Sequence, residues 1–452
     1  MQNPSNNCAE CMVRKESVVN KDRVIAYQLL TGFIALLVAI LVYSMGRFGF
    51  LDILGIKRPI EVALLIPLVG MGAFSIVNSG RAWKSPLFLL PLIFLAGEIL
   101  LRGNLLAIAD LLVATLLTGS IISLREDFAE KVLRCIIIIS GIFALLGILQ
   151  FFILYSDPSL ITHVLLFYDG YSGSDTVMIQ HPLSLLGLAT GEEYTLFGQH
   201  VTRLRSFTSE PSLIVAYFTL PGALAFTYRG RIRLCGWIIL VFSLISMAGT
   251  VFMSVVFSII VFIAFRVKSR LLHKFLPFFL MGFLILWLEV FNLDFILHII
   301  RYLAGIANFL DKIRSATVRF GFIMDTFHAV IEDPLGVRQD ITGAAGLILR
   351  SMAQSGFPGL IIMSALLISL FDKISRLYCF GGLDRGQKIG LIMLYGVFTT
   401  ASIFSDYGFV CAYGFTIITL AYYRLLKMES AEFSGDDQTL RVPESLYTEG
   451  LT

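Results

Sequence analysis

Long apolar stretches alternate with short polar segments along nearly the whole chain. A helix needs about 20 apolar residues to cross the hydrocarbon core of a bilayer. The pattern therefore predicts an all-α, polytopic membrane protein with about twelve transmembrane helices. The candidate spans are residues 24–44, 59–78, 86–101, 105–123, 132–155, 211–228, 234–249, 251–266, 274–291, 357–371, 387–404 and 408–426.

Composition supports this interpretation. The 452 residues are 57% hydrophobic and only 15% charged, whereas soluble domains carry about 25% charged residues. There is too little polar surface to cover a water-soluble globule of this size. The net charge of +3 is too small to indicate nucleic acid as a partner.

The basic residues beside the spans predict the orientation. The short segments on the side of the two termini hold 22 Lys and Arg, and the short segments on the other side hold 4, namely Arg47, Lys57, Arg58 and Arg102. Because Lys and Arg are enriched in cytoplasmic loops, both termini are expected in the cytoplasm. The chain is thus predicted to be a multi-pass protein of the cytoplasmic (inner) membrane.

This topology divides the chain into three parts. Residues 1–23 form a cytoplasmic tail, residues 24–427 form the membrane domain, and residues 428–452 form an acidic, disordered cytoplasmic tail. Within the membrane domain, two large outer loops are expected at 156–210 and 292–356.

The two outer loops carry most of the candidate chemistry. Their eight basic residues are Arg203, Arg205, Arg301, Lys312, Arg314, Arg319, Arg338 and Arg350. Seven are arginines, whose planar guanidinium forks match phosphate oxygens. The set indicates an anionic ligand such as a lipid phosphate or diphosphate. The alternative is that each arginine pairs with a loop carboxylate or a lipid headgroup.

One group of residues lies directly before the span at 211–228. Glu210 and Pro211 suit the first turn of a helix, which is an adequate structural explanation for both. Arg203 and Arg205 have no such explanation, because positive charge beside a helix N-terminus is unfavourable unless an anion lies between them. We therefore predict an anion site here.

A second group follows in the next outer loop. Residues 319–336 predict a short helix that ends before Pro334. Residues 343–359 end in Ser-Gly-Phe-Pro-Gly, where the glycines permit a tight re-entry into the next span.

The order of these motifs resembles the O-antigen polymerase and O-antigen ligase family of bacterial surface-polysaccharide enzymes. In that family an Arg precedes a helix-opening Pro by eight residues, as Arg203 precedes Pro211. A second Arg lies about fifteen residues before a P-x-G, as Arg319 precedes Pro334-Leu-Gly336, and a G-x-x-G-like element opens a late span, as in Gly356-Phe-Pro-Gly359. The resemblance covers residues 203–359, and the rest of the chain only through its topology.

Two departures from the family pattern bear on the choice of activity. The ligase branch places a His about ten residues before the late glycine motif, where this chain has Ala345 and Gly346. The glycine-rich continuation after the P-x-G is also altered, because Arg338 follows Val337. Arg338 is either an extra phosphate contact or the sign of a one-residue slip in the correspondence.

The resemblance implies a metal-independent glycosyltransferase with a GT-C-like multi-helix architecture and no cofactor. The expected reaction polymerises polyprenyl-diphosphate-linked repeat units into O-antigen, a part of lipopolysaccharide, or into exopolysaccharide, at the outer face of the membrane. Its implied partners are the lipid-linked glycan donor and acceptor, membrane lipids, a chain-length regulator and a flippase. Arginines would supply the positive charge that a diphosphate leaving group requires, so no metal is expected.

Within this reading, Arg203, Arg319 and Glu210 are the candidate catalytic residues. Arg205, Arg338, His181 and His200 are candidates for substrate binding, and the two histidines together with Glu192 and Glu193 remain alternatives to Glu210 as general base. Two other functions stay open. One is an O-antigen ligase, and the other is a polysaccharide or lipid transporter, although the chain shows no internal repeat of the kind many transporters have.

Overall fold

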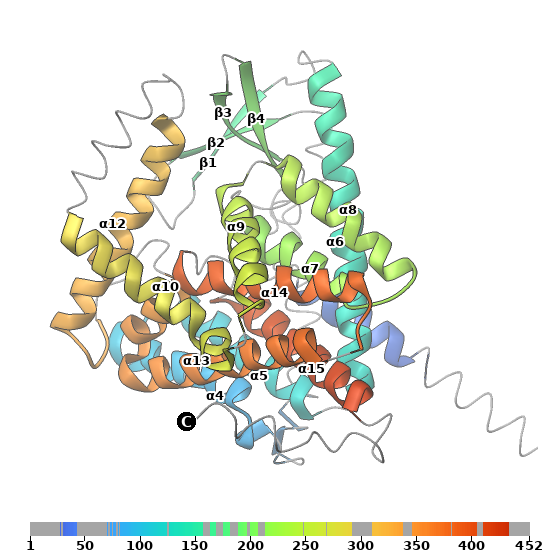
Figure 1. Cartoon of the computed structure of the whole chain (residues 1–452), viewed down its shortest axis with the longest axis vertical. Helices are drawn as coiled ribbons and strands as arrows, with labels where there is room; N and C mark the ends of the chain where they lie inside the picture. The colour runs from blue at the N-terminus through green and yellow to red at the C-terminus, as the bar shows by residue number, and fades with distance from the viewer. Residues whose placement is uncertain are drawn as a thin grey trace, which may run out of the picture.

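The structure is a computed structural model of the whole chain, and most of what it describes is helical (Figure 1). It describes residues 28, 30–42, 70, 73–74, 76–77, 80, 82–123, 126–156, 163–168, 175–180, 189–196, 199–206, 213–246, 248–267, 269–291, 310–337, 346–380, 382–404 and 410–433. For the strands and for residues 310–319, the structure describes the backbone.

Helices occur at every predicted span except 59–78, of which only a few residues are described. The first is Leu30–Val42. The others are α4 (Pro86–Gly97), the π-helical turn η2 (Glu98–Arg102), α5 (Leu105–Ser123), α6 (Glu126–Ser156), the π-helical turn η6 (Val215–Thr219), α7 (Leu220–Phe226), α8 (Arg231–Ile245), α9 (Gly249–Ala264), α10 (Arg270–Phe291), α12 (Leu310–Glu332), α13 (Gly346–Phe380), α14 (Arg385–Ile403) and α15 (Ala412–Phe433).

Three helical segments of the described chain are long and apolar enough to cross a membrane, namely Asp127–Phe152, Leu271–Val290 and Gly346–Cys379. A fourth is added if the bent pair α8 and α9 counts as one span. Several other helices are apolar but shorter than a full crossing. The structure is thus consistent with a helical membrane protein, and the count of twelve spans stays a prediction.

The long apolar run from Leu234 to Phe265 is interrupted where the sequence suggested. Helix α8 ends at Ile245 and α9 begins at Gly249, and the two axes are bent by 117°. The single run therefore forms two helices.

Helix α14 lies at the centre of the packing, with every residue from 394 to 403 buried. It packs against α7, α9 and α13. Tyr395, Phe398 and Tyr413 are among the largest fully buried side chains. Their close packing contributes van der Waals contacts that hold the central helices together.

Helix ends that were predicted to share the cytoplasmic side lie together in the structure. Arg424 near the end of α15 donates to Thr227 O at the end of α7 over 2.7 Å, and Arg233 of α8 donates to Asp384 before α14 over 2.8 Å. At the start of α10, Lys274 pairs with Asp372 of α13 at 3.1 Å. The alternation of helix directions therefore agrees with these predicted spans, whereas the side of the membrane is not tested by these contacts.

The first predicted outer loop contains strands, which the all-α expectation did not include. Strands β1 (His163–Tyr168), β2 (Asp175–Gln180), β3 (Ala189–Leu196) and β4 (Gln199–Ser206) form an antiparallel sheet in the order β1-β2-β3-β4. The reason is local. Residues 163–168 read His-Val-Leu-Leu-Phe-Tyr, an apolar run far too short to cross a membrane and rich in residues that favour strands.

The second predicted outer loop contains two helices. Helix α12 (Leu310–Glu332) ends before Pro334 as predicted, but it begins nine residues before Arg319 and is longer than the short helix that was expected. Helix α13 begins at Gly346, earlier than the predicted span at 357–371, and is interrupted by non-helical backbone at Ser355 and Gly356. The predicted boundary thus corresponds to a kink inside a longer helix. The amphipathic segment from Phe295 to Ile306 lies outside the described residues.

Candidate functional site

The predicted site residues of the first loop lie on β4 or outside the described residues. Arg203 and Arg205 both lie on β4, in the stretch where its pairing with β3 is irregular, and His200 of β4 is paired with Thr195 of β3. His181 and Glu210 lie outside the described residues. The grouping of all these residues around one anion therefore stays a prediction.

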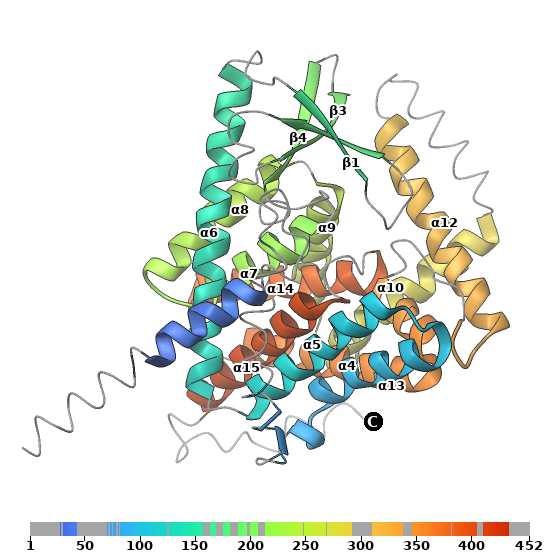
Figure 2. The same ribbon diagram turned by 180° about the vertical axis from the view of Figure 1, so that it is seen from behind.

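The predicted residues of the second loop divide in the same way. Arg319 lies on α12, and Arg338 lies outside the described residues, directly after Val337. Figures 1 and 2 place the sheet at the end of the molecule where α6 also ends and toward which α12 extends. Strand β4 packs against α6. The elements that carry Arg203 and Arg319 thus reach the same end of the molecule.

The two glycine motifs of the second loop meet in space. The backbone N–H of Val337 donates to Ala353 O over 2.8 Å, which joins the turn after α12 to the first part of α13. Gly356 has φ 62° and ψ −154°, a conformation available almost only to glycine. A Cβ atom there would lie 2.6 Å from Leu335 O. The close approach of these two segments therefore requires glycine at this position.

A buried arginine lies under this junction. Arg102 is on η2, and its side chain is only 4% exposed. Its Nη2 donates to Val337 O over 3.2 Å and to Ala353 O over 3.4 Å. One guanidinium thus connects Val337, directly after the P-L-G motif, with Ala353, in the part of α13 before the G-F-P-G motif.

The charge of Arg102 is balanced by Glu98, four residues earlier. Nη1 of Arg102 lies 3.2 Å from Glu98 Oε2, and the Glu98 side chain is 2% exposed. Oε2 also accepts a hydrogen bond from Gln354 Nε2 over 3.3 Å. A buried ion pair is stable only with good geometry and further hydrogen bonds, and Gln354 supplies one of them.

Two oxygens of this cluster are left without a donor. Glu98 Oε1 and Gln354 Oε1 are buried and accept no hydrogen bond from the residues that the structure describes. Buried polar atoms are nearly always satisfied by protein or ordered water, so both oxygens are positions for a water or hydroxyl donor. The turn itself is π-helical, a geometry that is frequent at functional sites.

Glu98 and Arg102 were not among the predicted site residues. Arg102 was assigned to a short outer segment, and Glu98 was only an ionisable residue inside a span. One signal was available in the sequence. Residues 97–103 read Gly-Glu-Ile-Leu-Leu-Arg-Gly, so that an acidic and a basic residue lie four positions apart, on one face of a helix, within an apolar region. Ionisable residues in such regions are usually functional or paired.

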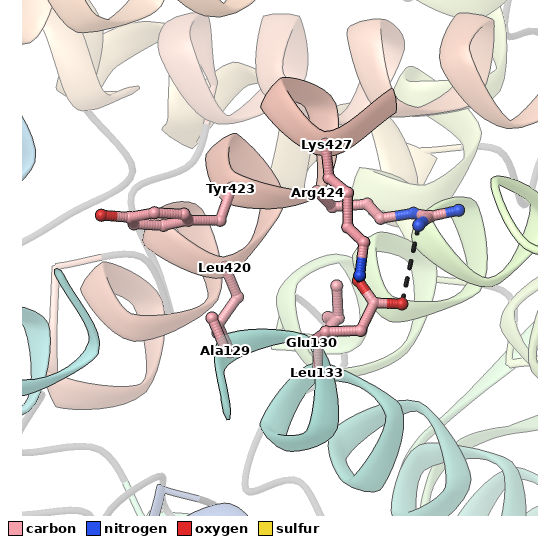
Figure 3. A pocket seen from close by; sticks show the side chains of 7 residues that line it. All are labelled: Ala129, Glu130, Leu133, Leu420, Tyr423, Arg424 and Lys427. Atoms are coloured by element: carbon pink, nitrogen blue, oxygen red, sulfur yellow. Dashed lines mark ion pairs between the residues drawn. The ribbon is translucent and has the colours of Figure 1, made fainter. Parts of the chain in front are cut away.

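A second charged cluster lies at the opposite helix ends. It surrounds a small pocket lined by Ala129, Glu130, Leu133, Leu420, Tyr423, Arg424 and Lys427 (Figure 3). Glu130 is buried and lies 3.6 Å from Arg424 and 3.1 Å from Arg134. Arg424 also stacks 3.8 Å from the centre of the Tyr228 ring. These contacts join α6 to the end of α15 and to the turn after α7.

Hydrogen bonds extend this cluster to the start of α14. Asp384 caps that helix by accepting from Gln387 N over 2.9 Å, and Gln387 Nε2 donates to Thr227 O over 3.2 Å. Burial would raise the pKa of Asp384, but hydrogen bonds from Arg233 and Gln387 and the charges of Arg233 and Arg229 outweigh it and lower the pKa below its ordinary value. The hydrogen bonds around Thr227 are thus satisfied, although Tyr228 Oη beside them is buried without a hydrogen-bond partner among the described residues. We interpret this second cluster as a structural link between helix ends.

The described residues contain no group of three or more His, Cys, Asp or Glu that could hold a metal ion. The expectation of a metal-independent site remains a prediction, since three of the seven predicted site residues lie outside the described residues and only the backbone is described for the other four.

No family model matches this chain, and neither a curated protein nor a solved structure is similar to it. The resemblance drawn from the motifs therefore stands on the residues of this chain alone.

Proposed function

We propose that the protein is a metal-independent glycosyltransferase that polymerises polyprenyl-diphosphate-linked repeat units into O-antigen or exopolysaccharide. The observation that carries this proposal is the junction at Arg102. The P-L-G and G-F-P-G motifs, which suggested the family from their order alone, lie against each other and are joined by a buried guanidinium.

The proposed reaction needs no group beyond side chains and the two lipid-linked glycans. A hydroxyl oxygen of the acceptor sugar bonds to the anomeric carbon of the donor, and the bond from that carbon to the diphosphate breaks. Arg203 and Arg319 would neutralise the diphosphate as it leaves with the electron pair. The hydroxyl proton would pass to a general base, for which Glu210 is the first candidate and His181, His200, Glu192 and Glu193 are the alternatives.

Arg205 and Arg338 would hold the donor beside these residues. Arg338 directly follows Val337, whose carbonyl is held by Arg102. The buried cluster therefore holds the last described residue before Arg338, which supports a role for this part of the chain in the site.

The ion pairs inside the helices do not favour the transporter alternative. Each carboxylate that could mark a transport path has a partner in the structure. Glu98 binds Arg102, Asp110 accepts from the N–H of Ala412 at 3.3 Å, and Glu289 lies 3.4 Å from His328. Contacts of this kind are typical of carboxylates that hold helices together, which favours a structural role over a transport path.

The direct test is the glycolipid that accumulates in a strain lacking the gene. Single unpolymerised repeat units on the lipid are the expected result. Full-length chains that remain on the lipid would identify a ligase instead, and repeat units trapped on the cytoplasmic face would identify a flippase. Either of these outcomes would refute the proposal.

A second test concerns the two arginines. Arg203→Ala and Arg319→Ala should each lower the polymerisation rate about a hundredfold at matched protein level, because removal of one such donor costs on the order of 3 kcal/mol. Arg→Lys should rescue only in part, since lysine keeps the charge and loses the fork. Arg301→Ala and Arg314→Ala are controls and should remain near normal. Full-length polymer from both test variants would exclude the diphosphate contacts.

A further inference from the structure

Helices α6 and α8 pack against each other, and on one side of this pair both helices carry exposed apolar side chains. A Cβ atom at Gly141 of α6 would lie 3.3 Å from Cys235 Cβ of α8, and one at Gly147 would overlap the Phe242 ring. The two pairs advance together along the chain, so the helices run in the same direction. Figures 1 and 2 both show the pair at one edge of the molecule.

On α6, the exposed apolar residues recur at intervals of three and four. They are Ile138, Ile142, Leu145, Leu149 and Phe152, each 43–59% exposed. That spacing places them on one face of the helix. Ser140, whose Oγ donates to Tyr217 O over 3.0 Å, marks the opposite, buried side.

A matching stripe runs along α8. It consists of Leu234, Trp237, Val241 and Leu244, again at intervals of three and four. Gly236 faces away from it, because a Cβ atom there would lie 3.0 Å from Ala225 Cβ of α7. Since α7 covers the inner side of the pair, both stripes border the outer side of the α6–α8 contact.

Two exposed arginines stand at the end of this surface where both helices begin. Arg134 of α6 is 52% exposed, and its Nε and Nη2 are bonded to Glu130, whereas Nη1 makes no hydrogen bond to the described residues. Arg231 is the first residue of α8, is exposed, and forms no ion pair within the described chain. At 3.6 residues per turn, both arginines lie between their helix's apolar stripe and the partner helix.

We propose that this surface binds one anionic phospholipid, with its phosphate on Arg134 and Arg231 and its acyl chains along the stripes of α6 and α8. Both the charge of the surface and its position at the predicted membrane interface support an anionic phospholipid. The basic end accepts a phosphodiester, and the helix end is the one predicted to face the anionic cytoplasmic leaflet. Trp237, half exposed close to that end, is the side chain favoured at a membrane–water interface.

The test uses the full-length protein purified in detergent and native mass spectrometry. Phosphatidylglycerol and phosphatidylethanolamine with identical acyl chains are added at equal concentration, and the bound fraction of each is measured. The wild type should retain the anionic lipid in preference. Arg231→Gln should weaken that retention about fivefold, and Arg134→Gln together with Arg231→Gln should weaken it further, since each basic residue near an anionic surface contributes about that factor.

Arg266→Gln is the matched control, because Arg266 is an exposed arginine that stacks on Phe262, 5.0 Å from its ring centre, at another helix end. Its retention of phosphatidylglycerol should not change. Arg231→Gln removes no ion pair with a described residue, so the variant is expected to fold, and an unchanged melting temperature without lipid will show this.

Several results would overturn the proposal. Equal binding of the two lipids, or an equal loss in Arg266→Gln, would mean a diffuse charge effect. Displacement of the lipid by millimolar inorganic phosphate would assign the arginines to a soluble anion. A lipid-free dimer that Trp237→Ala dissociates would assign the same surface to a second copy of the chain.

Discussion

Arg102 offers the sharpest perturbation of the candidate site. Arg102→Met keeps an unbranched side chain of similar length and removes the charge. Glu98, with a side chain 2% exposed, then loses its counter-charge, and Val337 O and Ala353 O lose their shared donor. Breaking one partner of a buried pair costs about 3–5 kcal/mol, because the remaining charge is left uncompensated.

The second variant separates the charge from the hydrogen bonds. Combining Glu98→Gln with Arg102→Met leaves no buried charge in this cluster. The double variant should therefore recover most of the free energy of unfolding that Arg102→Met loses through the uncompensated charge. The two carbonyls remain without Arg102, at about 1 kcal/mol each. The double variant should therefore be more stable than Arg102→Met alone and less stable than the wild type.

The assay is equilibrium unfolding of the purified protein in mixed micelles, followed for both single variants and the double variant. The coupling free energy comes from the resulting double-mutant cycle. Arg266→Met is the control, and it should change the free energy of unfolding by no more than about 1 kcal/mol, the value of an exposed cation–π contact. A loss in Arg102→Met no greater than in this control would refute the buried-pair argument, as would a double variant no more stable than Arg102→Met.

Three further predictions concern the kink, the second cluster and the metal. Gly356→Ala should lower the free energy of unfolding by about 1–3 kcal/mol or more, because Gly356 has a positive φ and an added Cβ would meet Leu335 O. Gly282→Ala in α10 is the control. A Cβ atom there would have no neighbour within 4 Å, so the free energy of unfolding should stay the same or rise by about 0.5–1 kcal/mol. Asp384 has a lowered pKa, so its stabilising contribution is present above the ordinary value of 3.8 and is lost as the pH falls through the lower folded value; melting curves from pH 6 to pH 2.5 should fall less steeply for Asp384→Asn, and parallel curves would contradict this. Polymerisation in a purified system should survive EDTA, and a loss that a divalent ion restores would overturn the metal-independent mechanism.

Helix positions could be predicted from the sequence because apolar runs were long and their ends were basic. The break between α8 and α9 was predicted because the apolar run was too long for one span, whereas the end of α12 at Glu332 was predicted from Pro334. The sheet was missed because residues 163–206 were judged only by their failure to span a membrane. Within β4, Arg203 and Arg205 alternate with Thr202 and Leu204, which is a strand pattern at short range.

The candidate site was predictable in part. The glycine motifs were visible as a tight re-entry, and Gly356 has the positive φ that such a turn requires. Their contact with η2 was not visible, because residues 98 and 354 are 256 positions apart in the chain. Pairing across that distance depends on tertiary packing, for which periodicity and local propensity carry no information.

The two charged clusters differ in a way that bears on function. Around Thr227, donors and acceptors from α7, α14 and α15 are matched to one another, although Tyr228 Oη beside them has no hydrogen-bond partner in the described chain. Around Arg102, two acceptor oxygens of one hydrogen-bonded pair, Glu98 Oε1 and Gln354 Oε1, remain without a donor in the described chain, and the turn that carries Glu98 is π-helical. Leaving such atoms unsatisfied costs about 1–3 kcal/mol each, and strain of this kind is found mainly where a site needs it. The end of the molecule that holds Arg102 is therefore where we expect the chemistry, and the end that holds Thr227 is where we expect the helices to be held fixed.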